Sequence, residues 1–442
     1  MCAIQRCKQK GKTLLQTLKE YIRPYLTLSA KQSGTVLAGD VVAKAITFAI
    51  SLVLLNVLAP GEYITFGLFM TVVAIVVQFS DSGLNQSFIR FFSLYKDTNP
   101  ARANAHLHFA ARFKLGIFVL LGVALYFTAS IISSSLDHPE LTSGIQLLAI
   151  GLTGIGIFEF SLSVQQARQE FTRMAVLRVA EAVLKIGFIL VFIVQGTFTL
   201  TNVYQAYSFV PIAVALFILF GTNIFRVKEQ YSTKEIGSEL LGFGKWVAFS
   251  SFATMFLQHI DTLIAAKLLP DADAGIYYAA RRLCIPLQVL TGSIVTVFFP
   301  KAMALQSLDD LRKYIRSSFK VSVPVAALTV LYLIAVLLAV PVFFPAYTDS
   351  IPLIIVLYFG WIWTLVGNPI TILLLSLNRA NVATYISFGQ LIVTGVMHWY
   401  FATYFGAMGV AVSSLFVWLL AGCVTYAFIY KYRHQIETVR KD

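Results

Sequence analysis

Charged residues are scarce in this chain of 442 residues: Asp, Glu, Lys and Arg together make up 12%. Soluble globular proteins carry about twice that share. Hydrophobic residues make up 58% of the chain, and they fall in runs of about 20, the length that spans the hydrocarbon core of a bilayer as a helix. The composition therefore excludes a soluble enzyme and predicts an all-helical integral membrane protein.

Signals of cofactor chemistry are also missing. The four cysteines form neither a disulfide framework nor a CxxC metal motif. No P-loop and no HExxH zinc motif occurs, so we expect no catalytic residues, no metal and no cofactor. The predicted outer loops are short, the longest at about 133–142 and 341–350, and hold no domain for a glycosyltransferase or ligase active site. The chain is therefore predicted to be a transporter rather than an enzyme, driven by an ion gradient, the membrane potential or the gradient of its own substrate.

Apolar runs bounded by charged, polar, Pro or Gly residues predict about 12 transmembrane helices. The predicted ranges are 35–58, 63–85, 110–132, 143–165, 175–195, 202–224, 243–268, 276–299, 321–343, 351–377, 382–404 and 408–430.

Similar residues recur at an offset of about 210, among them Pro60 with Pro270 and Gly196 with Gly406. Two parallel halves of six helices, forming two lobes around a central cavity, would explain this repeat. The predicted divisions are an N-terminal segment 1–34, a first lobe 35–225, a connection 226–242, a second lobe 243–430 and a tail 431–442.

The positive charge follows the predicted topology. The formal charge is +13, and about 29 of the 34 Lys and Arg residues fall on one side of the predicted membrane, with only Lys267 assigned to the other side. Positive loops stay cytoplasmic, so both termini are predicted to be cytoplasmic, and the basic, amphipathic segment 1–34 is expected to lie on the inner membrane surface. Topology accounts for the charge, and we expect no nucleic-acid partner.

Charges inside the predicted spans are the candidate functional residues, because an ionised group at mid-membrane costs about 2.5–3.5 kcal/mol and usually faces a wet cavity. Arginine suits phosphate because its guanidinium fork binds two oxygens at once. The basic candidates for binding a phosphate-bearing anion are Lys44, Lys185, Arg281 and Arg282.

Polar residues at helical spacing extend the candidate site. Those predicted to line the cavity, on the first and seventh predicted helices, are Asp40, Thr47, Ser51, Thr254 and Gln258. Carboxyl groups that could couple transport to H⁺ or Na⁺ are Asp261, Glu159 and Asp40.

A purely structural interpretation of the same residues stays open. Lys44 could pair with Asp40, Lys185 with Glu181 at helical spacing, and the two arginines with Asp261. The hydroxyl and amide side chains could bond helix to helix without meeting any substrate.

Short motifs at the helix ends carry a family resemblance. They are Leu58-Ala59-Pro60-Gly61-Glu62-Tyr63, Asp81-Ser82-Gly83-Leu84 followed by Arg90, Ala274-Gly275-Ile276-Tyr277, Leu377-Asn378-Arg379, and Gly406-Ala407-Met408-Gly409-Val410-Ala411. With these motifs in this order, the chain resembles the polysaccharide transporter family, the repeat-unit flippases of the multidrug/oligosaccharidyl-lipid/polysaccharide exporter superfamily. Ile64 departs from the Gly that this family usually carries after the Tyr of the first turn.

The resemblance implies a flippase in the bacterial inner (plasma) membrane. It would move an undecaprenyl-diphosphate-linked oligosaccharide, such as an O-antigen, capsule or exopolysaccharide (lipopolysaccharide-type) repeat unit, from the cytoplasmic to the periplasmic leaflet. The partners it implies are that polyprenyl-diphosphate-linked oligosaccharide, membrane lipids and other membrane proteins of polysaccharide assembly.

Two alternative functions are open to a protein of this composition. A cation-coupled multidrug exporter of the same superfamily would need acidic residues to dominate the cavity, whereas bases are prominent in these spans. A membrane-embedded polysaccharide polymerase or ligase would need a large outer loop, which the sequence lacks.

Overall fold

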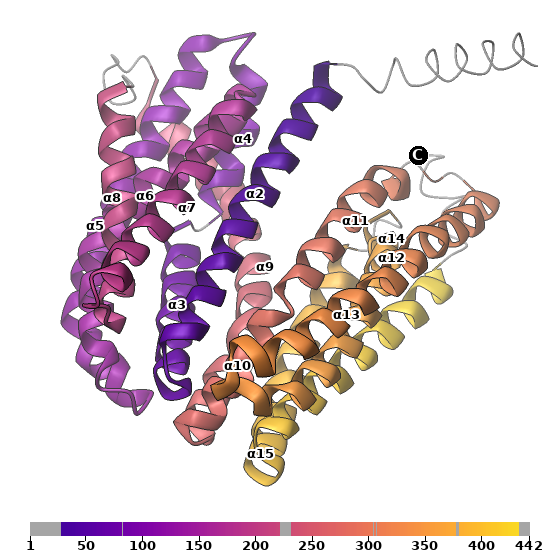
Figure 1. Ribbon diagram of the computed structural model, residues 1–442. Coiled ribbons are helices and arrows are strands. Elements are labelled where there is room, and N and C mark those ends of the chain that lie inside the picture. Colours follow the sequence, from indigo (N-terminus) through magenta and orange to yellow (C-terminus); the bar gives the residue numbers. More distant parts are fainter. Residues whose placement is uncertain are drawn as a thin grey trace, which may run out of the picture.

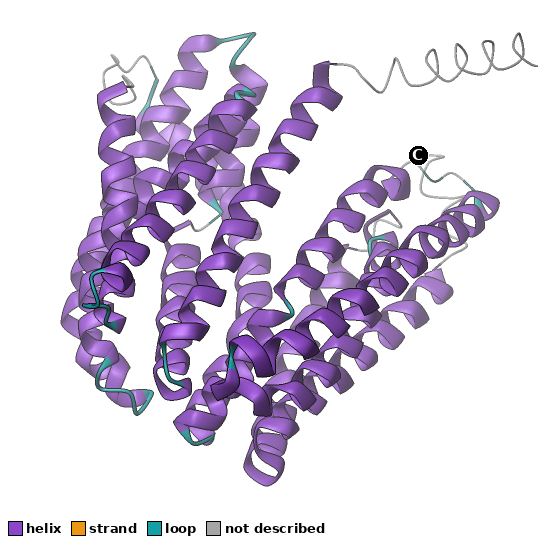
Figure 2. Cartoon of the chain, viewed as in Figure 1, coloured by secondary structure: helices purple, strands orange, loops and turns teal. Residues whose placement is uncertain are grey.

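The computed structural model describes residues 28–81, 83–221, 231–303, 305, 307–376 and 380–432. All regular structure within these ranges is helical (Figures 1 and 2). The elements are α2 (Leu28–Val57), α3 (Pro60–Asp81), α4 (Leu84–Tyr95), α5 (Pro100–Ser135), α6 (Leu141–Arg168), α7 (Phe171–Val194), α8 (Leu200–Gly221), α9 (Thr233–Leu268), α10 (Asp271–Leu283), α11 (Ile285–Met303), α12 (Leu308–Phe343), the 3₁₀ helix η1 (Pro345–Ser350), α13 (Ile351–Thr371), α14 (Leu373–Ser376) and α15 (Ala380–Tyr432).

The hydrophobic runs located the helices well. Among the described residues, nine helical segments are long and apolar enough to cross a membrane, and each of the predicted ranges overlaps a helix. One long predicted span, 276–299, is divided at Cys284 into α10 and α11. The short helix α4, which follows Gly83, was not predicted as a separate element. The count of twelve crossings and the cytoplasmic termini stay predictions.

The repeated glycines have a backbone explanation. Gly196 follows α7 with φ of 68°, and Gly406 interrupts α15 with φ of 60°. A positive φ is strained for residues with a side chain, so glycine is favoured wherever the chain must turn in this way. The predicted helices 382–404 and 408–430 are thus the two parts of α15, on either side of Gly406.

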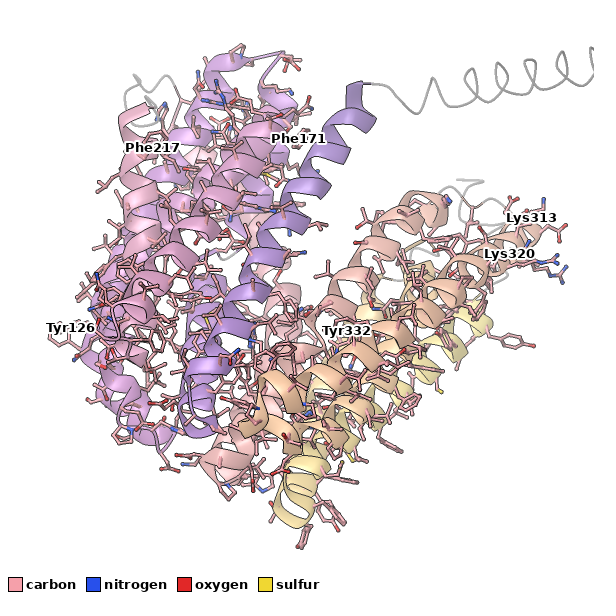
Figure 3. The ribbon with its side chains drawn as sticks, in the orientation of Figure 1. Tyr126, Phe171, Phe217, Lys313, Lys320 and Tyr332 are labelled. Atoms are coloured by element: carbon pink, nitrogen blue, oxygen red, sulfur yellow. The ribbon has the colours of Figure 1, made fainter. Side chains whose placement is uncertain are left out.

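The helices form two groups that meet at one end and diverge toward the other. Figure 1 shows α2 to α8 in one group and α10 to α15 in the other, with α9 running between them. The ends diverge on the side where Lys313 and Lys320 of α12 lie (Figure 3). Both lysines lie in a segment predicted to be cytoplasmic, so the two helix groups diverge toward the predicted inner side.

The start of α9 packs against the first group. Arg102 of α5 donates to Glu235 over 2.9 Å, and Nε2 of His106 lies 2.8 Å from Oε2 of Glu239. Residues 233–242, which the sequence predicted to be part of the connection, are helical and form the start of α9. The rest of that connection at 226–230, most of the N-terminal segment and the tail beyond residue 432 lie outside the described residues.

Aromatic rings fill the end at which the groups meet. The ring of Tyr63 on α3 lies 5.3 Å from that of Tyr278 and 5.7 Å from that of Tyr347, measured between centroids. The hydroxyl of Tyr347 donates to the carbonyl of Leu58 over 2.8 Å. Gly275 on α10 lies so near Pro60 that a Cβ atom would overlap the Pro60 carbonyl oxygen. We call this contact between α3, α10 and η1 the closed end.

Candidate functional site

A cavity of about 510 Å³ lies among α9, α10, α11, α13 and α15, and we call it the arginine cavity. Residues that line it include Thr254, Gln258, His259, Asp261, Arg281, Arg282, Gln288, Trp361, Thr364, Asn368, Gln390 and Trp418. The structure thus brings together five of the sequence candidates, those of α9 and α10.

Arg281 is neutralised inside this cavity. Its Nε atom lies 2.7 Å from Oδ2 of Asp261, and its guanidinium also donates to Oγ1 of Thr262 over 3.2 Å and to the carbonyl of Gln258. The hydroxyl of Tyr277 donates to the same carboxylate over 2.9 Å. For Arg281 the structure therefore shows the ion pair that the structural interpretation anticipated.

Arg282 has no such partner. Within the described ranges no carboxylate pairs with it, and its Nε atom is buried without a hydrogen bond. Its guanidinium carbon lies 5.6 Å from the ring centroid of Phe66 and 5.2 Å from that of Tyr278. Aromatic faces attract a cation without neutralising its charge. Arg282 is thus a cation that can bind an incoming anion without first losing a salt bridge.

Lys185 of the first group reaches the same aromatic cluster. It forms an ion pair with Glu181, one turn earlier on α7, and its ammonium lies 4.5 Å from the ring centroid of Tyr207. The Tyr207 ring is 6.0 Å from that of Phe66, which also contacts Arg282. Bases from both groups therefore converge on the rings of Phe66 and Tyr207.

The candidates on α2 are placed differently. Asp40 pairs with Arg178 of α7 rather than with Lys44, and Lys44 is exposed. Thr47 donates to the carbonyl of Ala43 over 2.9 Å. Ser51 is 2% exposed and donates to the Thr47 carbonyl over 3.3 Å. None of these α2 residues is among those that line the arginine cavity, and both hydroxyls bond within their own helix.

The three candidate coupling carboxylates also differ in their partners. Asp261 is held by Arg281 and Tyr277, and Asp40 is held by Arg178. Glu159 on α6 makes no ion pair and no side-chain hydrogen bond within the described part of the chain. It lies within electrostatic range of Lys114, Arg178 and Lys185.

Two paired bases, the buried Lys114 and the half-buried Arg178, were missed because the sequence assigned them to cytoplasmic segments. Lys114 is 2% exposed, and its ammonium lies 3.1 Å from Oδ1 of Asp81 and 2.5 Å from Oδ1 of Asn85. Arg178 is the partner of Asp40. A signal for Arg178 existed, because Arg178, Glu181 and Lys185 follow at spacings of three and four and so share one face of α7.

Comparisons with known proteins bear on the family and the fold. A family model described as polysaccharide biosynthesis protein matches residues 53–367. The lipopolysaccharide biosynthesis protein WzxC of Escherichia coli (strain K12) is 24% identical over an alignment of 423 residues that covers 88% of this chain and 79% of WzxC.

Two solved structures share the fold. One is the inward-facing conformation of a multidrug resistance MATE family transporter of the MOP superfamily, with a TM-score of 0.74 and 14% identity over 90% of this chain and 96% of that chain. The other is the lipid II flippase MurJ in its inward closed conformation, with a TM-score of 0.72 and 10% identity over 91% and 90%. Because the family model matches residues 53–367, well over half of the chain, the chain belongs to the polysaccharide biosynthesis protein family.

Proposed function

We propose that the protein is a flippase that carries polyprenyl-diphosphate-linked oligosaccharides from the cytoplasmic to the outer leaflet of the bacterial inner membrane. One observation carries the proposal: Arg282, a cation without a carboxylate partner among the described residues, faces a cavity of about 510 Å³ lined by α9 and the second helix group. A guanidinium in this state matches the two oxygens of a phosphate.

The route follows from the shape of the molecule. The diphosphate and sugars would enter between the diverging ends of the groups, while the polyprenyl tail stays in the surrounding lipid (Figure 1). Arg282 would bind the diphosphate, and Lys185 would approach it across the rings of Phe66 and Tyr207. Rocking of the two groups would then open the closed end and release the head group on the outer side. No bond is made or broken in this cycle.

The contents of the arginine cavity argue against export of organic cations. Such a ligand needs a carboxylate that is free to bind it. Among the described residues that line the arginine cavity, Asp261 is the single carboxylate, and Arg281 and Tyr277 already hold it. An anionic head group is therefore favoured over a cationic drug.

Transport in proteoliposomes tests the proposal directly. A labelled undecaprenyl-diphosphate oligosaccharide is reconstituted with the full chain, and its accessibility in each leaflet is followed over time. We expect protein-dependent flipping that liposomes without protein do not show. Efflux of cationic dyes without flipping of any lipid-linked sugar would instead assign the protein to the drug exporters.

Coupling to an ion gradient is expected to depend on Glu159. Protonation of Asp40 or Asp261 would break an ion pair, whereas Glu159 has none to lose. A gradient of one pH unit is worth about 1.4 kcal/mol, a factor of about ten in accumulation. Glu159→Gln should abolish this gradient-driven accumulation of the lipid-linked oligosaccharide, while flipping without a gradient continues.

Glu170 offers a matched control, because it forms an exposed pair with Arg173. Glu170→Gln should keep the response to the gradient. If Asp261→Asn removed the response and Glu159→Gln did not, Glu159 would not be the coupling residue. A response to Na⁺ alone would make the coupling ion sodium.

A further inference from the structure

A second cavity, of about 330 Å³, lies beside the arginine cavity between α13 and α15. Its lining residues include Trp363, Trp418, Tyr426, Asn368 and Gln390, and none of its lining residues is charged. We call it the tryptophan cavity. Its size falls within the range of small-molecule sites.

The two cavities adjoin each other. Thr364, Asn368, Gln390 and Trp418 line both of them. A ligand that places its charged part at Arg282 can therefore extend an uncharged part between α13 and α15. The pattern is a cationic compartment next to a neutral one.

The rings of the tryptophan cavity are held in fixed positions. The Trp363 and Tyr426 ring centroids are 6.0 Å apart, and Nε1 of Trp363 donates to the Trp418 carbonyl over 3.0 Å. A Cβ atom at Gly422 would come within 2.6 Å of Nε1 of Trp363. The rings thus need glycine on the facing helix, and they form a rigid surface rather than a loosely filled gap.

The amides of this cavity are available to a ligand. The side chains of Asn368 and Gln390 make no hydrogen bond within the described ranges, nor does the hydroxyl of Tyr426. An amide both donates and accepts, as does a sugar hydroxyl. Aromatic surfaces combined with such amides match the apolar face and the polar rim of an uncharged sugar ring.

We infer that the tryptophan cavity binds the uncharged sugar next to the diphosphate and thereby selects lipids that carry an oligosaccharide. The inference rests on the proposed function, since it assigns the sugar of that substrate to a place beside Arg282. It makes Asn368, Gln390 and Tyr426 specificity residues, distinct from the arginine that binds the diphosphate.

Flipping of two probes in the same proteoliposomes tests the inference. One probe is an undecaprenyl-diphosphate disaccharide with neutral sugars, and the other is undecaprenyl diphosphate. We expect the unmodified protein to prefer the sugar-bearing lipid, and the double variant N368L/Q390L to lose about 10-fold of that preference, because two hydrogen bonds are removed. Tyr426→Phe, a milder change that lies in the tryptophan cavity alone, should lose about threefold.

Trp399 provides the matched control, because it lies on α15 but is 55% exposed. Trp399→Leu should keep the preference for the sugar-bearing lipid. Equal losses for both lipids in N368L/Q390L and no change in Tyr426→Phe would show a structural role and overturn the inference. If the unmodified protein flipped both lipids equally, the inference would fail while the proposed function stood, and if it flipped neither, both would fail.

Discussion

Replacing Arg282 with Gln is expected to slow flipping of an undecaprenyl-diphosphate oligosaccharide about 10- to 100-fold, since hydrogen bonds to charged groups contribute about 1.5–3 kcal/mol. Arg282 pairs with no carboxylate among the described residues, so its removal leaves no buried acid uncompensated. Folding should therefore be preserved, and the loss should appear in transport of both sugar-bearing and sugar-free lipids. Initial rates in proteoliposomes, corrected for the amount of inserted protein, measure it.

Arg281 supplies the control, because it differs from its neighbour in being paired. Arg281→Gln alone would leave Asp261 as an uncompensated charge and should lower the thermal stability of the protein in detergent. The double variant R281Q/D261N removes both charges and should flip within a few-fold of the unmodified protein. Flipping by Arg282→Gln at the normal rate, or an equal loss in R281Q/D261N, would contradict the assignment of the diphosphate to Arg282.

The sequence could predict that Arg281 and Arg282 are candidate functional residues, but not which of the two is neutralised. A charge within an apolar run is costly in any membrane fold, so Arg281 and Arg282 could be selected from the sequence alone. Which of them is neutralised depends on where Asp261 of α9 meets α10, a tertiary contact that spacing along one helix does not contain. For the same reason the helical spacing pairs Asp40 with Lys44, four residues away, whereas its partner is Arg178 of another helix.

The positions of the helices could be predicted from the sequence, whereas the tryptophan cavity could not. Runs of apolar residues locate spans because bilayer thickness fixes their length. By contrast, aromatic residues make up 14% of the chain, so Trp363 and Trp418 carry no distinguishing signal in the sequence. Only their approach across α13 and α15, against glycines on the facing helix, shows that they enclose a neutral space.

A second large effect is expected from Gly275→Ala at the closed end. The added methyl group would overlap the carbonyl oxygen of Pro60, and because that atom belongs to the backbone, α3 and α10 must move apart. Overpacking of this kind costs about 1–3 kcal/mol, so the population with the closed end open should rise about 10- to 100-fold. The variant is therefore expected to favour the opposite conformation of the transport cycle.

Labelling of a single cysteine measures this shift. Ser51 is 2% exposed and accepts from the hydroxyl of Tyr63 through its carbonyl, over 3.4 Å. With the native cysteines replaced, Ser51→Cys should react slowly with a membrane-impermeant maleimide, and about 10- to 100-fold faster when Gly275→Ala is added. Gly116→Ala is the matched control, since a Cβ there meets nothing within 4 Å. Two results would contradict the prediction: faster labelling of Ser51→Cys when Gly116→Ala is added, or an unchanged labelling rate when Gly275→Ala is added.

The exposed ion pair at the same end should matter less. Lys267 lies 2.6 Å from Oδ2 of Asp137, but the two side chains are 39% and 68% exposed, and such pairs contribute at most about 1 kcal/mol. Lys267→Ala should therefore speed labelling of Ser51→Cys no more than about fivefold. A larger effect for Lys267→Ala than for Gly275→Ala would show that charge, rather than the close approach of α3 and α10, keeps the outer side shut.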